Sequence, residues 1–252
     1  MKHQNTRQCL IFAHRGANRE AAENTRSAFD TALKYAIDGM ETDVQLSRDE
    51  VAVLWHDRSL DKVGLPDKHI DDFDYAQLQA MNFAAHFSPG ADPQGIMTLK
   101  EFLDAYRTRC RLLVEIKNRE WEIPSRHEIK VRHTLDMAGT VNNDAIIVSS
   151  FNLASLAYAH RYRPEFPLVY NFEPEQTLED ARRVLTEQPF LHGLCLPIES
   201  LDDAMVKLLR AHGKTIAVYT CNSEEEIDQA LQSEVDILIS DLPQKALQMR
   251  DA

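Results

Sequence analysis

The sequence has few of the features that mark secreted or membrane-spanning proteins. Its four cysteines, Cys9, Cys110, Cys195 and Cys221, lie far apart and form no CxxC motif, which indicates reduced thiols rather than disulfides. No apolar run approaches the ~20 residues that a membrane span needs. The apolar run before His14 has only five residues and is too short for a secretory signal. We therefore expect a soluble cytoplasmic protein with no stable membrane insertion.

Glycine and basic residues are also scarce. The chain has 8 glycines in 252 residues, and the segment HRGANRE after the first apolar run contains neither GxGxxG nor GxxxxGK[ST]. This argues against an open doubly wound sheet, which usually carries such a phosphate loop. Lys and Arg number 28 against 40 Asp and Glu, for a net charge of -12. That balance argues against a nucleic-acid partner, although a few local cations or a metal ion can still hold an anionic substrate.

Short apolar runs alternate with amphipathic segments along the chain, so that a predicted helix follows each predicted strand. Eight such units in 252 residues are typical of a closed TIM (β/α)₈ barrel of the α/β class, predicted here as one domain over residues 1–252. The predicted strands are 9–14, 40–46, 112–117, 145–150, 167–172, 193–197, 215–220 and 236–240. The predicted helices are 25–38, 98–107, 125–138, 152–161, 175–187, 199–211, 223–232 and one from Pro243.

One part of the chain departs from this alternation. The apolar run 51–56 predicts a hairpin with strand 40–46, and residues 57–96 are irregular, with scattered Gly, Pro and Asp. We therefore expect an insertion after the second strand, over about residues 45–96. Before it, Thr25 is expected to cap the first helix, and Gly39 suits the C-terminal end of that helix.

Several predicted strands end in charged residues. His14 ends the first strand, and active sites of TIM barrels lie at the C-terminal ends of the strands. Glu41 and Asp43 are two residues apart on the second strand, so they share one face. Glu115 and Lys117 are spaced in the same way on the third strand. These positions break the apolar run expected of a buried parallel strand and indicate a functional site.

The three carboxylates predict a metal site. Glu41, Asp43 and Glu115 would repel one another if they were buried without a cation. Oxygen ligands without cysteine or clustered histidine favour one divalent cation, Mg²⁺ or Ca²⁺, over zinc, with Mn²⁺ as a further candidate. The alternative is that the carboxylates are exposed and pair with Arg or Lys.

A second histidine is expected to join this site. His56 ends the hairpin in VLWHDRSL, which leaves and returns at the same end of the barrel, so His56 should face His14 across the metal. Two imidazoles suit acid–base catalysis, because their pKa lies near neutral pH. The other histidines are expected to be packed or surface residues: His3, His69, His86, His127, His133, His160, His192 and His212.

The motifs, taken in order, resemble those of the glycerophosphodiester phosphodiesterase family. The string HRGANREAAENTRSAF and the later ETDV and HD match the family pattern HRG, ENT, E-x-D-V and HD. Further matches are MTLKEFL (97–103), VEIK (114–117), SSFN (149–152) and VDILISDLP (235–243). The resemblance implies a TIM barrel that uses a divalent metal to hydrolyse a small-molecule glycerophosphodiester to an alcohol and sn-glycerol 3-phosphate.

The resemblance also implies roles for individual residues. It implies acid–base catalysis by His14 and His56, metal binding by Glu41, Asp43 and Glu115, and phosphate contacts by Arg15 and Lys117. It leaves open which histidine is the base, and whether water attacks directly or a glycerol hydroxyl first forms a cyclic phosphate. The sequence assigns no oligomeric state.

Two segments depart from the family pattern. The family often has R-T-T after HD, where this chain has LDKVGLP with Lys62, and its late W-T-V-N reads YTCN here. Tyr219 therefore stands where an aromatic wall beside the substrate is expected. Pocket walls set specificity on this fold, so two alternatives remain. One is a lysophospholipase D-type or phosphoinositide-directed enzyme with an acyl entrance near Phe73, Phe83 and Phe87. The other is a barrel that binds a phosphodiester without turnover.

Overall fold

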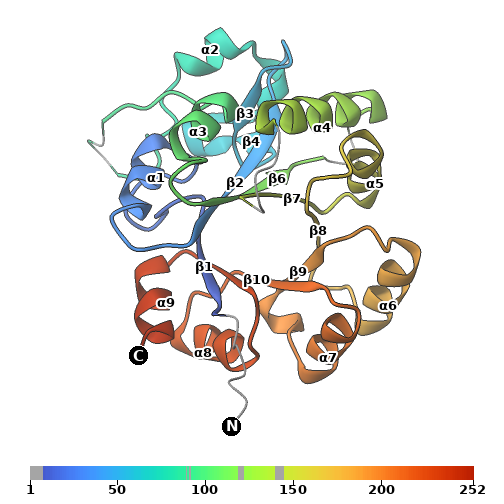
Figure 1. The fold of residues 1–252 in the computed structure, drawn as a ribbon. Helices are drawn as coiled ribbons and strands as arrows, with labels where there is room; N and C mark the ends of the chain where they lie inside the picture. Colours follow the sequence, from blue (N-terminus) through green and yellow to red (C-terminus); the bar gives the residue numbers. More distant parts are fainter. Residues whose placement is uncertain (1–7, 89, 91, 119–121, 140–144) are drawn as a thin grey trace.

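The computed structural model describes residues 8–88, 90, 92–118, 122–139 and 145–252. Within these ranges eight parallel strands close into a barrel, because β1 (Leu10–His14) pairs with both β2 (Gly39–Leu46) and β11 (Ile237–Ser240) (Figure 1). The predicted TIM barrel is confirmed. The other barrel strands, in order around the ring from β2, are β6 (Arg111–Ile116), β7 (Ile146–Ser150), β8 (Leu168–Asn171), β9 (Gly193–Pro197) and β10 (Thr215–Tyr219).

A helix follows each barrel strand and covers the outside of the barrel (Figure 1). Polar caps begin several of them, and Thr25 caps the first as predicted, since its hydroxyl accepts from the Ala28 amide at 3.3 Å. The last helix packs beside β1. The helices are α1 (Arg26–Ala32), α3 (Leu99–Tyr106), α4 (Pro124–Ala138), α5 (Leu153–Tyr162), α6 (Leu178–Glu187), α7 (Asp203–Ala211), α8 (Glu224–Gln232) and α9 (Pro243–Arg250).

The first helix is shorter than predicted. The prediction extended it to residue 38 and placed its C-terminal end at Gly39, but α1 ends at Ala32 and Gly39 begins β2. A Cβ atom on Gly39 would lie 2.5 Å from the ring of Phe12 inside the barrel. Close packing against an aromatic ring therefore requires glycine here. Helices 175–187 and 199–211 also begin later than predicted, and the second is preceded by the 3₁₀ turn η3 (Ile198–Ser200).

Alternate side chains of the barrel strands point into its interior. One buried cluster consists of strand residues only and fills that interior: Phe12, Leu113, Ile147, Val169, Cys195, Ala217, Ile237 and Ile239. A second cluster packs the other face of the strands against the helices. Because side chains alternate with a period of two, the residue two positions after an interior apolar residue also points inward. This places His14, Glu115 and Asn171 above the apolar layer, at the C-terminal end of the barrel.

The insertion after β2 forms a separate layer against one side of the barrel (Figure 1). β3 (Ala52–Leu54) pairs antiparallel with β2, as the predicted hairpin requires, although β2 itself runs to Leu46, past the predicted start of the insertion. The rest comprises β4 (Ser59–Leu60), η1 (Asp61–Val63), β5 (Leu65–His69), η2 (Ile70–Asp72) and α2 (Tyr75–Gln79). Trp55 and Phe83 belong to its own apolar cluster.

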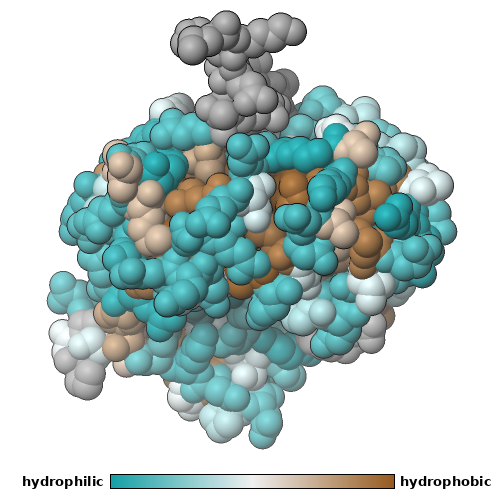
Figure 2. All heavy atoms as spheres, turned by 90° about the horizontal axis from the view of Figure 1, so that it is seen from below, coloured by the Kyte–Doolittle hydropathy of each residue, from teal (hydrophilic) through white to brown (hydrophobic). Residues whose placement is uncertain are grey.

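Little large apolar surface is exposed. Among the described residues, the large apolar side chains that are exposed are Phe87, Ile123 and Tyr162. On the face in Figure 2, hydrophilic side chains predominate and apolar surface shows between them. No helix in the described ranges is long and apolar enough to cross a membrane.

Candidate active site

The C-terminal ends of the barrel strands surround a cavity of about 130 Å³. Seven of the eight residues predicted for the site line it: His14, Arg15, Glu41, His56, Glu115, Lys117 and Tyr219. The eighth, Asp43, is 1% exposed and forms ion pairs with Arg15 and Lys117. The structure therefore brings the predicted residues together.

The strand register explains why the three carboxylates converge. Asp43 on β2 lies opposite Glu115 on β6, and Glu41 points to the same interior face two residues earlier. One oxygen from each of the three carboxylates lies within 4.8 Å of the other two, and all three residues are buried. The alternative of exposed carboxylates that pair with Arg or Lys is wrong in the exposure, although Asp43 and Glu115 do form such pairs. A buried set of oxygen donors of this kind fits a hard divalent cation such as Mg²⁺ or Ca²⁺.

Two cations lie among these carboxylates. Nζ of Lys117 is 3.0 Å from Asp43 Oδ1 and 2.7 Å from Glu115 Oε1, and Arg15 Nε is 3.1 Å from Asp43 Oδ2. Burial raises the pKa of Asp43, but Lys117 and Arg15 outweigh it and hold that pKa well below its ordinary value. Burial and the neighbouring Asp43 raise the pKa of Glu41 well above its ordinary value. Three buried carboxylates against two buried cations leave negative charge that a metal ion can neutralise.

Arg15 reaches this site through a sharp turn after β1. Its φ is +54° and that of Gly16 is +83°, a left-handed conformation that glycine adopts readily. A Cβ on Gly16 would also lie 2.6 Å from the carbonyl carbon of Ala28. The turn lets the Arg15 amide donate to Glu41 Oε2 at 3.2 Å while Nη1 of the guanidinium donates to Glu23 at 2.9 Å. The glycine thus sets the direction of the side chain before it.

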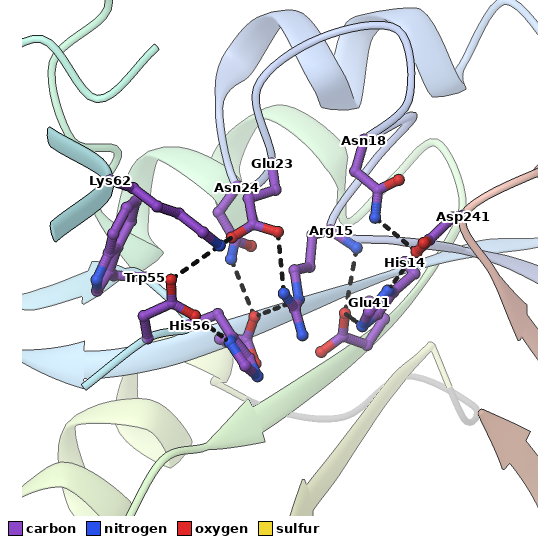
Figure 3. Close-up of polar contacts among 12 residues, drawn as sticks. His14, Arg15, Asn18, Glu23, Asn24, Glu41, Trp55, His56, Lys62 and Asp241 are labelled. Carbon is purple, nitrogen blue, oxygen red and sulfur yellow. Dashed lines mark hydrogen bonds and ion pairs between the residues drawn. The ribbon is translucent and has the colours of Figure 1, made fainter. Parts of the chain in front are cut away.

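His14 is held by a residue from the other end of the chain. Its Nδ1 is 2.6 Å from Asp241 Oδ1, and its Nε2 is 3.9 Å from Glu41 Oε2 (Figure 3). Burial and the Arg15 guanidinium lower the pKa of His14, and the hydrogen bond to Asp241 opposes them. Asp241 also accepts hydrogen bonds from Asn18 and from other side chains around it.

His56 is held in a similar way from the insertion. Its Nδ1 is 2.7 Å from Oδ1 of Asp57, whose other oxygen lies 2.8 Å from Lys62 Nζ. The same Nζ is 2.7 Å from Glu23, which in turn accepts from Arg15. Figure 3 shows this continuous chain of contacts from the insertion to the turn after β1. Charges from two distant segments therefore position His56 and Arg15 together.

The opposite wall of the cavity is largely apolar and aromatic. Tyr219 and Phe151 meet edge to face, with ring centroids 6.0 Å apart. The Tyr219 hydroxyl donates to the Phe172 carbonyl, and burial raises the pKa of this phenol above its ordinary value. Cys195 and Asn171 lie on the same wall.

Sequence analysis assigns no role to five polar residues that the structure places in or behind the site: Glu23, Asn24, Asp57, Asn171 and Asp241. The first three belong to the quoted motifs ENT and HD, and Asp241 belongs to the quoted motif VDILISDLP. Asn24, for example, donates to Asp43 at 2.9 Å. Asn171 and Asp241 lie on the interior face at the ends of β8 and β11, and strand parity is the signal that could have found them.

The remaining histidines lie elsewhere. His3 lies outside the described residues, and none of the other seven lines the cavity. Of the phenylalanines considered for an acyl entrance, Phe83 is 2% exposed within the apolar cluster of the insertion and Phe73 packs against that cluster. Phe87 is 36% exposed.

Comparison with known proteins connects this geometry to one family. The profile of the glycerophosphoryl diester phosphodiesterase family matches residues 14–245. A glycerophosphodiester phosphodiesterase of Bacillus altitudinis is 28% identical, over 96% of this chain and 98% of its own. The protein of Mycobacterium tuberculosis named "probable glycerophosphodiester phosphodiesterase 1" is 32% identical, over 87% of this chain and 84% of its own.

The same relationship holds for a solved structure. A phosphodiesterase of Oleispira antarctica, solved in complex with its product sn-glycerol-3-phosphate, is 25% identical with a TM-score of 0.86. The match covers 97% of this chain and 98% of that one. The family profile spans nearly all of the chain, from the first site histidine to the last helix. The chain therefore belongs to the glycerophosphoryl diester phosphodiesterase family and is a hydrolase.

Proposed function

We propose that this chain hydrolyses glycerophosphodiesters to an alcohol and sn-glycerol 3-phosphate, as a single domain and with one divalent cation. The observation that carries the proposal is the convergence of two histidines, two cations and three buried carboxylates on one cavity. Each group has a task in phosphodiester hydrolysis. The family of the chain and the named activities of its relatives support the same reaction.

The charged side of the cavity binds the phosphate. Glu41, Asp43 and Glu115 would hold Mg²⁺ or Ca²⁺, which when bound there offsets charge on the phosphate oxygens. Arg15 and Lys117 add two cationic donors at the same place. Their ion pairs with carboxylates limit their motion, so they are in position before the substrate arrives. Prearranged donors of this kind stabilise a transition state without reorganisation during the reaction.

The two histidines transfer protons. Asp241 and Asp57 each hold one Nδ1, which leaves Nε2 of His14 and of His56 for exchange with the substrate or the nucleophile. One histidine takes the proton from the attacking hydroxyl, and the other gives a proton to the leaving alcohol. Tyr219 and Phe151 form the wall against which the organic part of the substrate packs.

The test is release of glycerol 3-phosphate from glycerophosphocholine and glycerophosphoethanolamine. The protein is first treated with EDTA and then given Mg²⁺, Ca²⁺ or Mn²⁺. We expect no release after EDTA and recovery with at least one ion. Release that is equally fast after EDTA would contradict the metal, and no release with any ion would contradict the activity. Lysophosphatidylcholine dispersed in detergent, assayed in parallel, tests the lipid-directed alternative.

A further inference from the structure

Asn171 has an unusual position in the cavity. It ends β8, four strands away from β1 in either direction around the ring, so it faces the His14 side across the barrel. The residue is 4% exposed and lines the cavity. Its Nδ2 donates a long hydrogen bond to Ser149 Oγ at 3.4 Å. Among the described residues, Oδ1 has no hydrogen-bond partner.

A buried amide oxygen without a hydrogen-bond partner destabilises the folded protein, because its contacts with water are lost and not replaced. Two other cavity atoms without a hydrogen bond, Arg15 Nε and Glu115 Oε1, each lie in an ion pair, whereas the Asn171 oxygen is neutral and lies in none. The cost is explained if a ligand atom supplies the missing donor.

The residues around Asn171 indicate which kind of ligand group can donate a hydrogen bond to its Oδ1. The wall around it consists of Cys195, Phe151 and Tyr219, and the hydroxyl of Tyr219 already donates to the Phe172 carbonyl. The carboxylates and cations of the site stand on or directly after β1, β2 and β6, and the nearest of these strands, β6, is two positions from β8 around the ring. A phosphate that contacts Arg15 and the three carboxylates' metal site can extend its organic group toward β8 and Asn171. A hydroxyl of that organic group is a donor that can pair with the amide oxygen of Asn171.

We infer that Asn171 is a specificity-determining residue, whose Oδ1 accepts a hydrogen bond from a hydroxyl of the organic group attached to the phosphate. This inference rests on the proposed function and extends it to the selection of hydroxylated over plain alkyl groups. A site with a buried hydrogen-bonding group rejects ligands that lack the matching hydroxyl, because the buried group is then left unpaired.

Binding to the whole protein tests the inference without requiring turnover. The probes are sn-glycerol 3-phosphate and propyl phosphate, which has the same carbon chain without hydroxyls, titrated calorimetrically in the presence of Mg²⁺ or Ca²⁺. We expect the wild type to prefer glycerol 3-phosphate by tenfold or more. Asn171→Leu, which has a similar shape, should lower that preference by roughly tenfold, the value of one hydrogen bond.

Tyr170→Phe is the matched control, since Tyr170 is the preceding residue of β8 and packs on the outer side of the barrel. It should keep the wild-type preference. Asn171→Ala serves as the second variant if the leucine variant does not fold. A wild type without preference, or folded Asn171 variants with the full preference, would overturn the inference. If the preference depends on Asn171 but glycerophosphodiesters are not hydrolysed, the proposed function fails and this inference stands.

Discussion

His14 Nδ1 lies 2.6 Å from Asp241 Oδ1. A residue of the first barrel strand is therefore held by the residue that directly follows the last barrel strand. The two strands are neighbours in the closed ring, although the residues are 227 positions apart. Burial raises the pKa of Asp241, but the contacts with His14, Asn18 and Arg19 together outweigh it and hold that pKa below its ordinary value. An ionised Asp241 accepts a hydrogen bond from Nδ1–H of the imidazole, which leaves Nε2 of His14 facing the cavity.

Asp241→Asn should lower kcat by roughly 10²-fold or more with a smaller change in KM, because an amide does not keep the imidazole in one tautomer. Arg19→Ala is the matched control, since Arg19 also contacts Asp241, at 2.9 Å, but is 61% exposed. Exposed ion pairs contribute little, so its kcat should stay within about threefold. Steady-state kinetics over a pH series, with melting temperatures alongside, separates the roles. An Asn variant with the wild-type pH profile and kcat would contradict a positioning role.

The two histidines should be needed separately. His14→Ala and His56→Ala should each lower kcat by roughly 10²–10⁴-fold, the usual contribution of one acid–base group. His192→Ala is the control, because His192 is exposed and precedes β9 at the opposite end of the barrel. The measurement is single-turnover release of glycerol 3-phosphate with saturating metal. Near-wild-type turnover in both variants would refute the assignment.

Glu41→Gln should change activity and stability in opposite directions. The pKa of Glu41 is raised in the folded protein by burial and by Asp43, so the folded state binds more protons at this residue than the unfolded state. The free energy of unfolding then falls as pH rises above the ordinary value of 4.5. Without metal, the glutamine variant should therefore melt at a higher temperature than the wild type near pH 7, by roughly 2–4 °C per kcal/mol, and should be inactive.

Calorimetry with and without Mg²⁺ or Ca²⁺ checks this prediction. A metal that binds the folded state should raise the melting temperature of the wild type and have little effect on the Glu41 variant. Glu187→Gln, at the exposed end of α6, controls for the loss of one negative charge. If the metal raises the melting temperatures of wild type and Glu41→Gln equally, Glu41 is not a ligand.

The sequence predicts the barrel and most of the cavity residues, because the alternation of side chains along a strand and the apolar spacing along a helix repeat within a few residues. The alternation of strand residues places Glu41 with Asp43, and Glu115 with Lys117, before any tertiary contact is known. The place of Gly39 at the start of β2, and not at the end of α1, is not predictable in this way, because it depends on tertiary packing against Phe12. Contacts made by ring closure, such as that between His14 and Asp241, depend on which strands become neighbours.

Lys62 should act by positioning the residues around it. It stands where the family often has arginine, and its Nζ lies 2.7 Å from Glu23 Oε1 and 2.8 Å from Asp57 Oδ2. Burial lowers the pKa of Lys62, but the two carboxylates outweigh it and raise that pKa, so the side chain stays charged.

Lys62→Met leaves the carboxylates facing each other and should lower kcat/KM by about tenfold. The effect is modest because the side chain is 37% exposed. The loss should shrink in 0.5 M salt, which screens the repulsion. Lys62→Arg should retain most of the activity, and Lys68→Met, on exposed β5, should have no effect. The prediction is contradicted if Lys62→Arg lowers kcat/KM as much as Lys62→Met and if salt changes kcat/KM in neither variant. That result would show that charge at this position does not orient the site.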